Sequence, residues 1–224
     1  MGSDTALREA RPSGDTKGSA ASDNDAPRAR RQDNRREAVM DAAARLFAEQ
    51  GYRATTVRDI ASAAGMLPGS VYYHFKSKDA LLLAVYREGV ARIIARVDAA
   101  TEGESDPWAR LEAASVGHLE AILDANAYAQ IIVRVLPGDA SEVAEALTEA
   151  RDEYEDRFRR LIDPIELSPG VERGRLRLML LGALNWAKIW YRPGGGDPAT
   201  IAKDFIAILR TGAAGNAPNA ETNR

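Results

Sequence analysis

The residues best able to do chemistry lie in a short run of glycine, serine and tyrosine that begins at Pro68. Hydroxyl groups can donate hydrogen bonds to phosphate, and a tyrosine ring can lie against a sugar or a thymine methyl. At about 100° per residue, a helix over this run turns Val71 and Phe75 inward and presents Gly69 and Tyr73 on the opposite side. The spacing therefore predicts an outward face fitted to a polar, groove-shaped partner.

This run is the second of two short helical segments within residues 56–75. Thr56 followed three residues later by Asp59 is a capping signal that opens the first segment, and Gly65 ends it. Two short helices joined by a three-residue turn with a glycine have the size of a helix-turn-helix. Because the second helix of that motif enters the major groove, we expect double-stranded DNA as a partner.

The rest of the sequence predicts an all-α protein, since no segment shows the alternation of a strand. Asn34 followed by Glu37 reads as a capping box that opens the first helix, which Gly51 ends. Six further helices are expected at about 77–100, 107–124, 126–136, 139–162, 171–191 and 197–212.

Charge is distributed unevenly along the 224 residues, whose formal net charge is −3. Residues 34–79 carry seven basic and five acidic side chains, a net +2, whereas residues 80–224 carry a net −5. The N-terminal third can therefore face phosphate, and the remainder is repelled by it.

Several classes of protein are disfavoured. The absence of cysteine excludes disulfides, thiolate metal sites and cysteine nucleophiles, and it fits a reducing cytoplasm. The two histidines, His74 and His118, lie too far apart in sequence to predict a metal cluster, and no catalytic or phosphate-cradling motif is present. We expect no enzyme, no cofactor, no metal and no membrane segment, and a cytoplasmic location associated with the nucleoid.

The segment from Asn34 to Ile94 resembles the tetracycline-repressor (TetR) family of bacterial regulators. The stretch AARLFAEQGYRATTVRDIASAAG, followed by GSVYYHFKSKDAL, carries the resemblance. It implies a nine-helix homodimer with an N-terminal three-helix DNA-binding domain and a C-terminal helical domain for ligand binding and dimerisation. It further implies DNA contacts from the matching positions Thr56, Arg58, Pro68, Gly69, Ser70, Tyr72, Tyr73, His74 and Lys78.

One position departs from the family pattern. Leu67 stands where the family usually has a serine or threonine that caps the recognition helix. The helix thereby loses a cap worth about 1 kcal/mol.

The expected organisation is a disordered tail over 1–32, the DNA-binding domain over 33–94, the ligand-binding and dimerisation domain over 95–212, and a frayed tail over 213–224. The first tail ends in a basic cluster from Arg28 to Arg36. Two interpretations stay open for this cluster: a solvated tail, or an arm that contacts DNA.

The segment 175–198 is apolar on nearly every side of its predicted helix, as expected for a helix buried in a core or against a partner. The family resemblance implies that the last two helices pair with those of a second copy. The expected interface residues are Leu180, Leu184, Ile201, Phe205 and Leu209. Such a dimer presents two recognition helices about one turn of DNA apart and reads a palindromic operator.

A small effector is expected among the middle helices, in an apolar and aromatic pocket. The candidate ligand residues are Trp108, His118, Tyr128, Arg134 and Trp186, with Ile132, Tyr154 and Phe158 as further members of the lining. For each of them, simple packing in the core is the competing interpretation. Arg134, which has apolar neighbours in sequence, needs either an anionic ligand or an acidic side chain.

The nature of the effector rests on a second resemblance. The stretches MLPGSVYYHF and LLGALNWAKIWYRPGG are similar to actinobacterial repressors of cholesterol catabolism and to acyl-CoA-responsive repressors. This implies an acyl-CoA thioester or a steroid-derived metabolite as inducer. A repressor of a drug-efflux gene that senses lipophilic compounds is the alternative, and activation instead of repression stays open.

Overall fold

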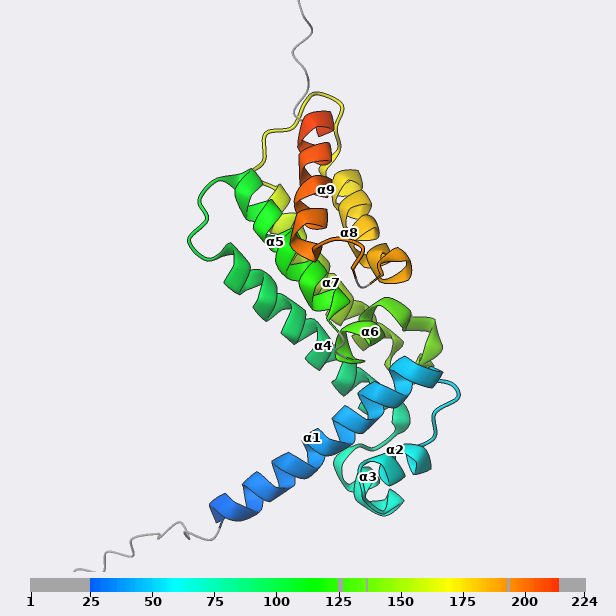
Figure 1. The fold of residues 1–224 in the computed structure, drawn as a ribbon. Helices are drawn as coiled ribbons and strands as arrows, with labels where there is room; N and C mark the ends of the chain where they lie inside the picture. The colour runs from blue at the N-terminus through cyan, green and yellow to red at the C-terminus, as the bar shows by residue number, and fades with distance from the viewer. Residues whose placement is uncertain (1–24, 125–126, 136, 193, 214–224) are drawn as a thin grey trace, which may run out of the picture.

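The computed structural model describes residues 25–124, 127–135, 137–192 and 194–213, and within these ranges it contains only helices and turns, as predicted. Figure 1 shows their arrangement. The helices are α1 (Asp25–Gln50), α2 (Val57–Ala63), α3 (Pro68–His74), α4 (Lys78–Thr101), α5 (Pro107–Leu123), α6 (Ala127–Arg134), α7 (Ala144–Ile162), α8 (Arg173–Trp190) and α9 (Pro198–Ala213). Two 3₁₀ turns, η1 (Pro137–Asp139) and η2 (Ser141–Val143), precede α7, which begins later than expected.

The molecule is elongated, with α2 and α3 at one end and α8 and α9 at the other (Figure 1). Helix α1 packs on α2 and α3, and α4 leads away from this end and packs along α5. Helix α4 continues through residue 94, so the expected domain boundary lies inside one unbroken helix. In the described part of the chain, no helix has the length and apolar character needed to cross a membrane.

Polar caps fix where several helices begin. Thr56 and Asp59 form the predicted capping box at α2, with the Thr56 hydroxyl accepting from the Asp59 amide at 3.2 Å. The Ser77 hydroxyl caps α4 and the Asp106 carboxylate caps α5, each accepting from the backbone amide three residues on. These contacts satisfy backbone donors that have no partner within the helix.

The predicted start of the first helix at Asn34 is wrong. Helix α1 begins at Asp25, so Asn34 lies within the helix and residues 25–32 are helical instead of part of an irregular tail. Pro27 falls in the first turn, where a missing backbone N–H costs nothing. Residues 1–24 and 214–224, which carry the other predicted tail segments, lie outside the described residues.

Two glycines let helices touch α4 closely. A Cβ on Gly89 would lie 2.8 Å from the carbonyl oxygen of Tyr128 in α6. A Cβ on Gly117 of α5 would lie 2.9 Å from the carbonyl oxygen of Arg96 in α4. Any larger residue would push these backbones apart, so α4 is held directly against both neighbours.

Candidate nucleic-acid interface

The back of α3 is buried as the helical spacing predicted. Val71 is 2% exposed and Phe75 6%, and both belong to a core shared with Ile60 and Ala61 of α2. The guanidinium of Arg36 in α1 covers the Phe75 ring at 5.2 Å. Helix α3 is therefore fixed on α1 and α2 with one side turned outward.

The outward side carries the residues predicted to contact DNA. Tyr72 is 55% exposed and Tyr73 is 73% exposed. Pro68, Gly69 and Ser70 are exposed beside them. A Cβ on Gly69 would meet no atom of the chain within 4 Å, so nothing in the protomer itself requires a glycine there. The open space beside this backbone is available to a partner.

Helix α1 also reaches this face, which the sequence did not reveal. Gln32 Nε2 donates a hydrogen bond of 3.1 Å to the Tyr73 hydroxyl, and the ring of His74 meets the Tyr73 ring edge-on at 5.2 Å. Gln32 was assigned to the irregular tail, and only the extended α1 places it next to α3.

Thr56 and Arg58 lie on the outer side of α2. The Thr56 hydroxyl donates a hydrogen bond of 2.7 Å to the Asp59 carboxylate, and the Thr56 backbone amide donates a second one. Together these two bonds lower the pKa of Asp59. In the single chain, the side chain of Thr56 is therefore engaged in capping α2. Arg58 is exposed and can contact solvent or phosphate.

Lys78 has a structural role that sequence reasoning missed. Its ammonium donates to the carbonyl oxygens of Tyr52 at 3.0 Å and Thr55 at 2.9 Å, and it lies 4.2 Å from the centre of the Tyr52 ring. The Tyr52 hydroxyl in turn donates to Asp79, and burial together with that carboxylate raises the pKa of Tyr52. Lys78 therefore ties the start of α4 to the loop before α2, with one N–H left for another acceptor.

Two candidate ligand residues link α6 to α1 instead of lining an effector pocket together. The Tyr128 hydroxyl donates to Asp41 at 2.7 Å. Arg134 donates to the carbonyl oxygen of Ala48 near the C-terminal end of α1. The observed partner is thus a backbone carbonyl, which differs from the anionic ligand or acidic side chain predicted for Arg134. A guanidinium at a helix C-terminus stabilises carbonyl groups that lack intrahelical donors.

The structure gathers three other candidates in one buried cluster. His118, Tyr154 and Phe158 have ring centres 5.6–5.8 Å apart, and the Tyr154 hydroxyl is hydrogen-bonded to His118 Nδ1. Burial lowers the pKa of His118 to about 4. His118 is thus a neutral histidine packed in the core, as in the alternative to ligand binding that the sequence left open.

Trp108 and Trp186 do not join this cluster. Trp108 is 9% exposed and packs under Arg210 of α9, whose guanidinium lies 5.9 Å from the ring centre. Trp186 is 63% exposed on the outside of α8, so within one protomer its placement in an interior pocket is wrong.

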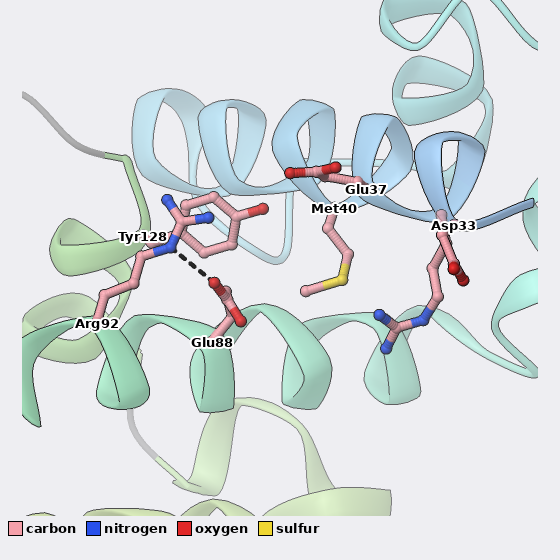
Figure 2. A pocket seen from close by; sticks show the side chains of 7 residues that line it. Asp33, Glu37, Met40, Glu88, Arg92 and Tyr128 are labelled. Carbon is pink, nitrogen blue, oxygen red and sulfur yellow. Dashed lines mark hydrogen bonds and ion pairs between the residues drawn. The ribbon is translucent and has the colours of Figure 1, made fainter. Parts of the chain in front are cut away.

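A cavity of about 280 Å³ does lie between α1 and α4, and its walls are mostly charged. Figure 2 shows Met40 reaching from α1 towards α4, from which Glu88 and Arg92 point back, while Glu37 lies along α1 and Asp33 lies at the other end of the view. Arg92 pairs with Glu88 at 2.8 Å, and its guanidinium lies 4.1 Å from the centre of the Tyr128 ring. Such walls suit a polar occupant better than an apolar effector.

The predicted interface residues need correction. Leu180, Leu184 and Leu209 are 1%, 0% and 9% exposed in the single chain, so they face its own core, and Ile201 and Phe205 are partly buried. The same two helices expose a different apolar set: Leu178, Met179, Trp186, Ile189, Trp190 and Ile208. We call these six residues the outer α8–α9 face.

Family models match both halves of the chain. Residues 39–85 match the model described as bacterial regulatory proteins, tetR family. Residues 104–213 match the model described as tetracyclin repressor-like, C-terminal domain.

Similar proteins of known description are repressors. The HTH-type transcriptional repressor KstR2 of Rhodococcus jostii (strain RHA1) is 35% identical over 192 residues, which are 80% of this chain and 91% of that protein. The solved structure of the ketosteroid transcriptional regulator KstR2 of Mycobacterium tuberculosis has a TM-score of 0.65 and 28% identity, covering 80% of this chain and 94% of that one. These relatives are regulators and not enzymes, in agreement with the sequence analysis.

A more distant likeness concerns the fold alone. The structure of AibR in complex with isovaleryl coenzyme A and operator DNA has a TM-score of 0.64 and 23% identity, covering 78% of this chain and 97% of that one.

Proposed function

Because the chain belongs to the TetR family of bacterial regulatory proteins, we propose that it represses transcription by binding a palindromic operator as a homodimer until a small effector releases it. The observation that carries the DNA-binding part is the exposed face of α3. Tyr72 and Tyr73 stand 55% and 73% exposed on a helix whose back is fully packed. Two outward aromatic side chains beside an open glycine backbone suit a groove of duplex DNA.

The homodimer is supported by the outer α8–α9 face. Its six large apolar residues form a patch that water contacts in a lone protomer, and such patches are typical of association surfaces. A groove of about 470 Å³ between the start of α8 and the end of α9 continues this patch past Met179 and Ile208. The partner that covers the outer α8–α9 face is a second copy of the chain. A two-fold axis through this face brings the same residues of both copies together and places the two recognition helices for the two halves of a palindrome.

The effector proposed is an acyl-CoA thioester or a steroid-derived metabolite. The relative named as a ketosteroid transcriptional regulator supports the steroid part, and AibR, a protein of the same fold solved with isovaleryl coenzyme A, supports the acyl-CoA part. A cationic pair in the C-terminal domain is consistent with a phosphate-bearing ligand. Burial lowers the pKa of Lys188, the charge of Arg134 close by lowers it further, and the carboxylate of Asp124 opposes both effects. Two cations that repel one another are stabilised by an anion between them.

The drug-efflux alternative has less support. A sensor of lipophilic cations is expected to bury acidic groups in its pocket. Among residues whose burial the structure describes, the buried polar side chains are Thr55, Ser115 and His118, which carry no carboxylate. The carboxylates that line the cavity between α1 and α4 are accompanied there by Arg36 and Arg92, which disfavour a cationic occupant. The relatives described as repressors likewise favour repression over activation, and a repressor acts in the cytoplasm, where bacterial operators are.

The test is a mobility-shift titration on DNA from upstream of the gene, with and without a panel of acyl-CoAs and steroid-CoA thioesters. We expect the wild type to shift this DNA in preference to random competitor, and one thioester to abolish the shift. The variant Tyr73→Ala should retain the competitor-level binding, and its preference for the operator should fall by about 1–3 kcal/mol. A wild type that shows no preference for any duplex site contradicts the proposal.

A further inference from the structure

Large apolar side chains are exposed in only two places in the described part of the chain. Six of them form the outer α8–α9 face, and the other three are Leu67, Tyr72 and Tyr73 at α3. Leu67 is the most exposed of all nine, at 77%. It therefore does not belong to a random scatter of surface leucines but lies on the proposed DNA-binding surface.

Leucine at this position weakens the protomer. Leu67 is the N-cap of α3 and forms no side-chain hydrogen bond, whereas Thr56, Ser77 and Asp106 cap α2, α4 and α5. A serine or threonine at residue 67 would satisfy a backbone donor and expose less apolar surface. Nothing in the fold of one protomer accounts for the leucine.

The backbone holds Leu67 at the leading end of the recognition helix. Its φ and ψ of −78° and 147° are extended, its carbonyl oxygen accepts from the Ser70 amide at 2.9 Å, and Pro68 follows at the first helical position. In a helix-turn-helix, residues at this end of the second helix meet base edges in the major groove. The apolar group that base edges present there is the 5-methyl of thymine.

We infer that the Leu67 side chain reads a thymine by packing against its 5-methyl group, and so determines one base of each operator half-site. This inference rests on the proposed function and adds to it a base and the residue that selects it. Leu67 contributes no hydrogen bond to the discrimination, so the contact depends on the methyl group alone.

The test replaces thymines of the operator singly by deoxyuridine, which removes the methyl group and keeps base pairing. Titrations compare the wild type with Leu67→Ala and with Leu67→Ser, whose hydroxyl restores a cap and so guards against misfolding of α3. For the wild type we expect one thymine per half-site at which uracil weakens binding about fourfold, which corresponds to about 0.8 kcal/mol for one buried carbon. For both variants the same replacement should have no effect, while uracil elsewhere in the operator affects all three proteins equally.

The possible failures are distinguishable. If the wild type prefers the operator but uracil costs the same for the wild type and for Leu67→Ala, the inference is wrong and the proposed function stands. If Leu67→Ala binds the operator as tightly as the wild type, the inference is also wrong. If the wild type prefers no duplex site, both the proposed function and the inference about Leu67 are wrong.

Discussion

The side-chain amide of Gln32 donates a hydrogen bond of 3.1 Å to the hydroxyl of Tyr73, which joins the N-terminal part of α1 to the outward face of α3. Tyr73 is 73% exposed, and besides this bond its ring has the edge-on contact with the ring of His74. The bond gives the ring a preferred direction before any partner arrives, which reduces the entropy lost on binding.

The first prediction concerns this pair. Tyr73→Ala should weaken binding to the operator by about 1–3 kcal/mol, because it removes a contact to base or sugar. Gln32→Ala should cost less, about 0.5–1 kcal/mol, because it removes only the orientation of that contact. In a background of Tyr73→Phe, Gln32→Ala should have no further effect. Fluorescence anisotropy on labelled operator measures all three, and additive effects would show that the bond does not matter.

Lys78 and Lys76 offer a matched pair of lysines at the start of α4. Lys78→Ala should lower the free energy of unfolding by about 1–3 kcal/mol, because the carbonyl oxygens of Tyr52 and Thr55 lose a charged donor. Lys76 is exposed, so Lys76→Ala should change stability by less than about 0.5 kcal/mol. Urea denaturation followed by circular dichroism separates them. Equal stability of the two variants would contradict the structural role of Lys78.

The same two lysines test the contact with phosphate. Each substitution should reduce the slope of log affinity against log salt by about one unit if its ammonium neutralises a phosphate. A slope unchanged in Lys78→Ala, with a lowered stability, would assign Lys78 to the fold alone.

Stability should fall in mild acid because of His118. Its pKa is about 4 in the folded chain and about 6.5 when unfolded, so both states are neutral above pH 6.5 and only the unfolded state gains the proton between pH 6.5 and 4. The folded state should therefore lose about 3 kcal/mol as the pH falls across this window, with little further loss from this residue below pH 4. His118→Asn keeps an acceptor for the Tyr154 hydroxyl and should flatten the pH dependence, whatever its effect on absolute stability. An unaltered slope in the variant would contradict this assignment.

The missing cap of α3 predicts a gain in stability. Leu67→Ser should raise the free energy of unfolding by about 0.5–1 kcal/mol, because serine accepts from a backbone amide that leucine leaves without a side-chain partner. Thermal denaturation measures this, and Leu67→Ala serves as the control that removes the leucine without adding a cap. A serine variant no more stable than the alanine variant would show that the cap does not form.

The outer α8–α9 face predicts the assembly state. Trp186→Glu should increase the dissociation constant of the dimer more than a hundredfold, since two buried indoles are lost and two charges enter the interface. Trp186 is 63% exposed in one chain, so the protomer should keep its fold. Sedimentation velocity measures the change, with Glu149→Arg on α7 as a charge-altering control. A dimer that persists in Trp186→Glu would place the interface elsewhere.

Local sequence signals were sufficient wherever one short-range interaction decides the structure. The capping box of Thr56 with Asp59 and the inward turn of Val71 and Phe75 both depend on neighbours within four residues, and both are confirmed. At Asn34 two local signals compete. Helix-compatible residues and a proline in the first turn let the helix start at Asp25, so the later cap is not used.

The candidate sites were harder to predict because their partners are distant in sequence. In a helix that is apolar on nearly all sides, such as α8, the positions of the apolar residues do not show which side faces the protein's own core. Leu180 and Leu184 were therefore assigned to the wrong surface. Arg134 binds the backbone carbonyl of Ala48, an acceptor that every residue possesses and that no side-chain pattern marks. Gln32 reaches Tyr73 only because α1 begins at Asp25 and carries Gln32 past α3.

The glycine contacts on both sides of α4 determine how force passes through the molecule. At Gly89 and Gly117 the nearest atom across the contact is a backbone carbonyl oxygen, that of Tyr128 or of Arg96, which cannot yield by changing rotamer. A push on α5 or α6 is therefore not absorbed locally, and the three helices shift as one solid block. The protomer should therefore bend at the two ends of α4. One is the Ser77 cap beside the DNA-binding helices, and the other is the turn after Thr101, where Gly103 has a φ of 82°.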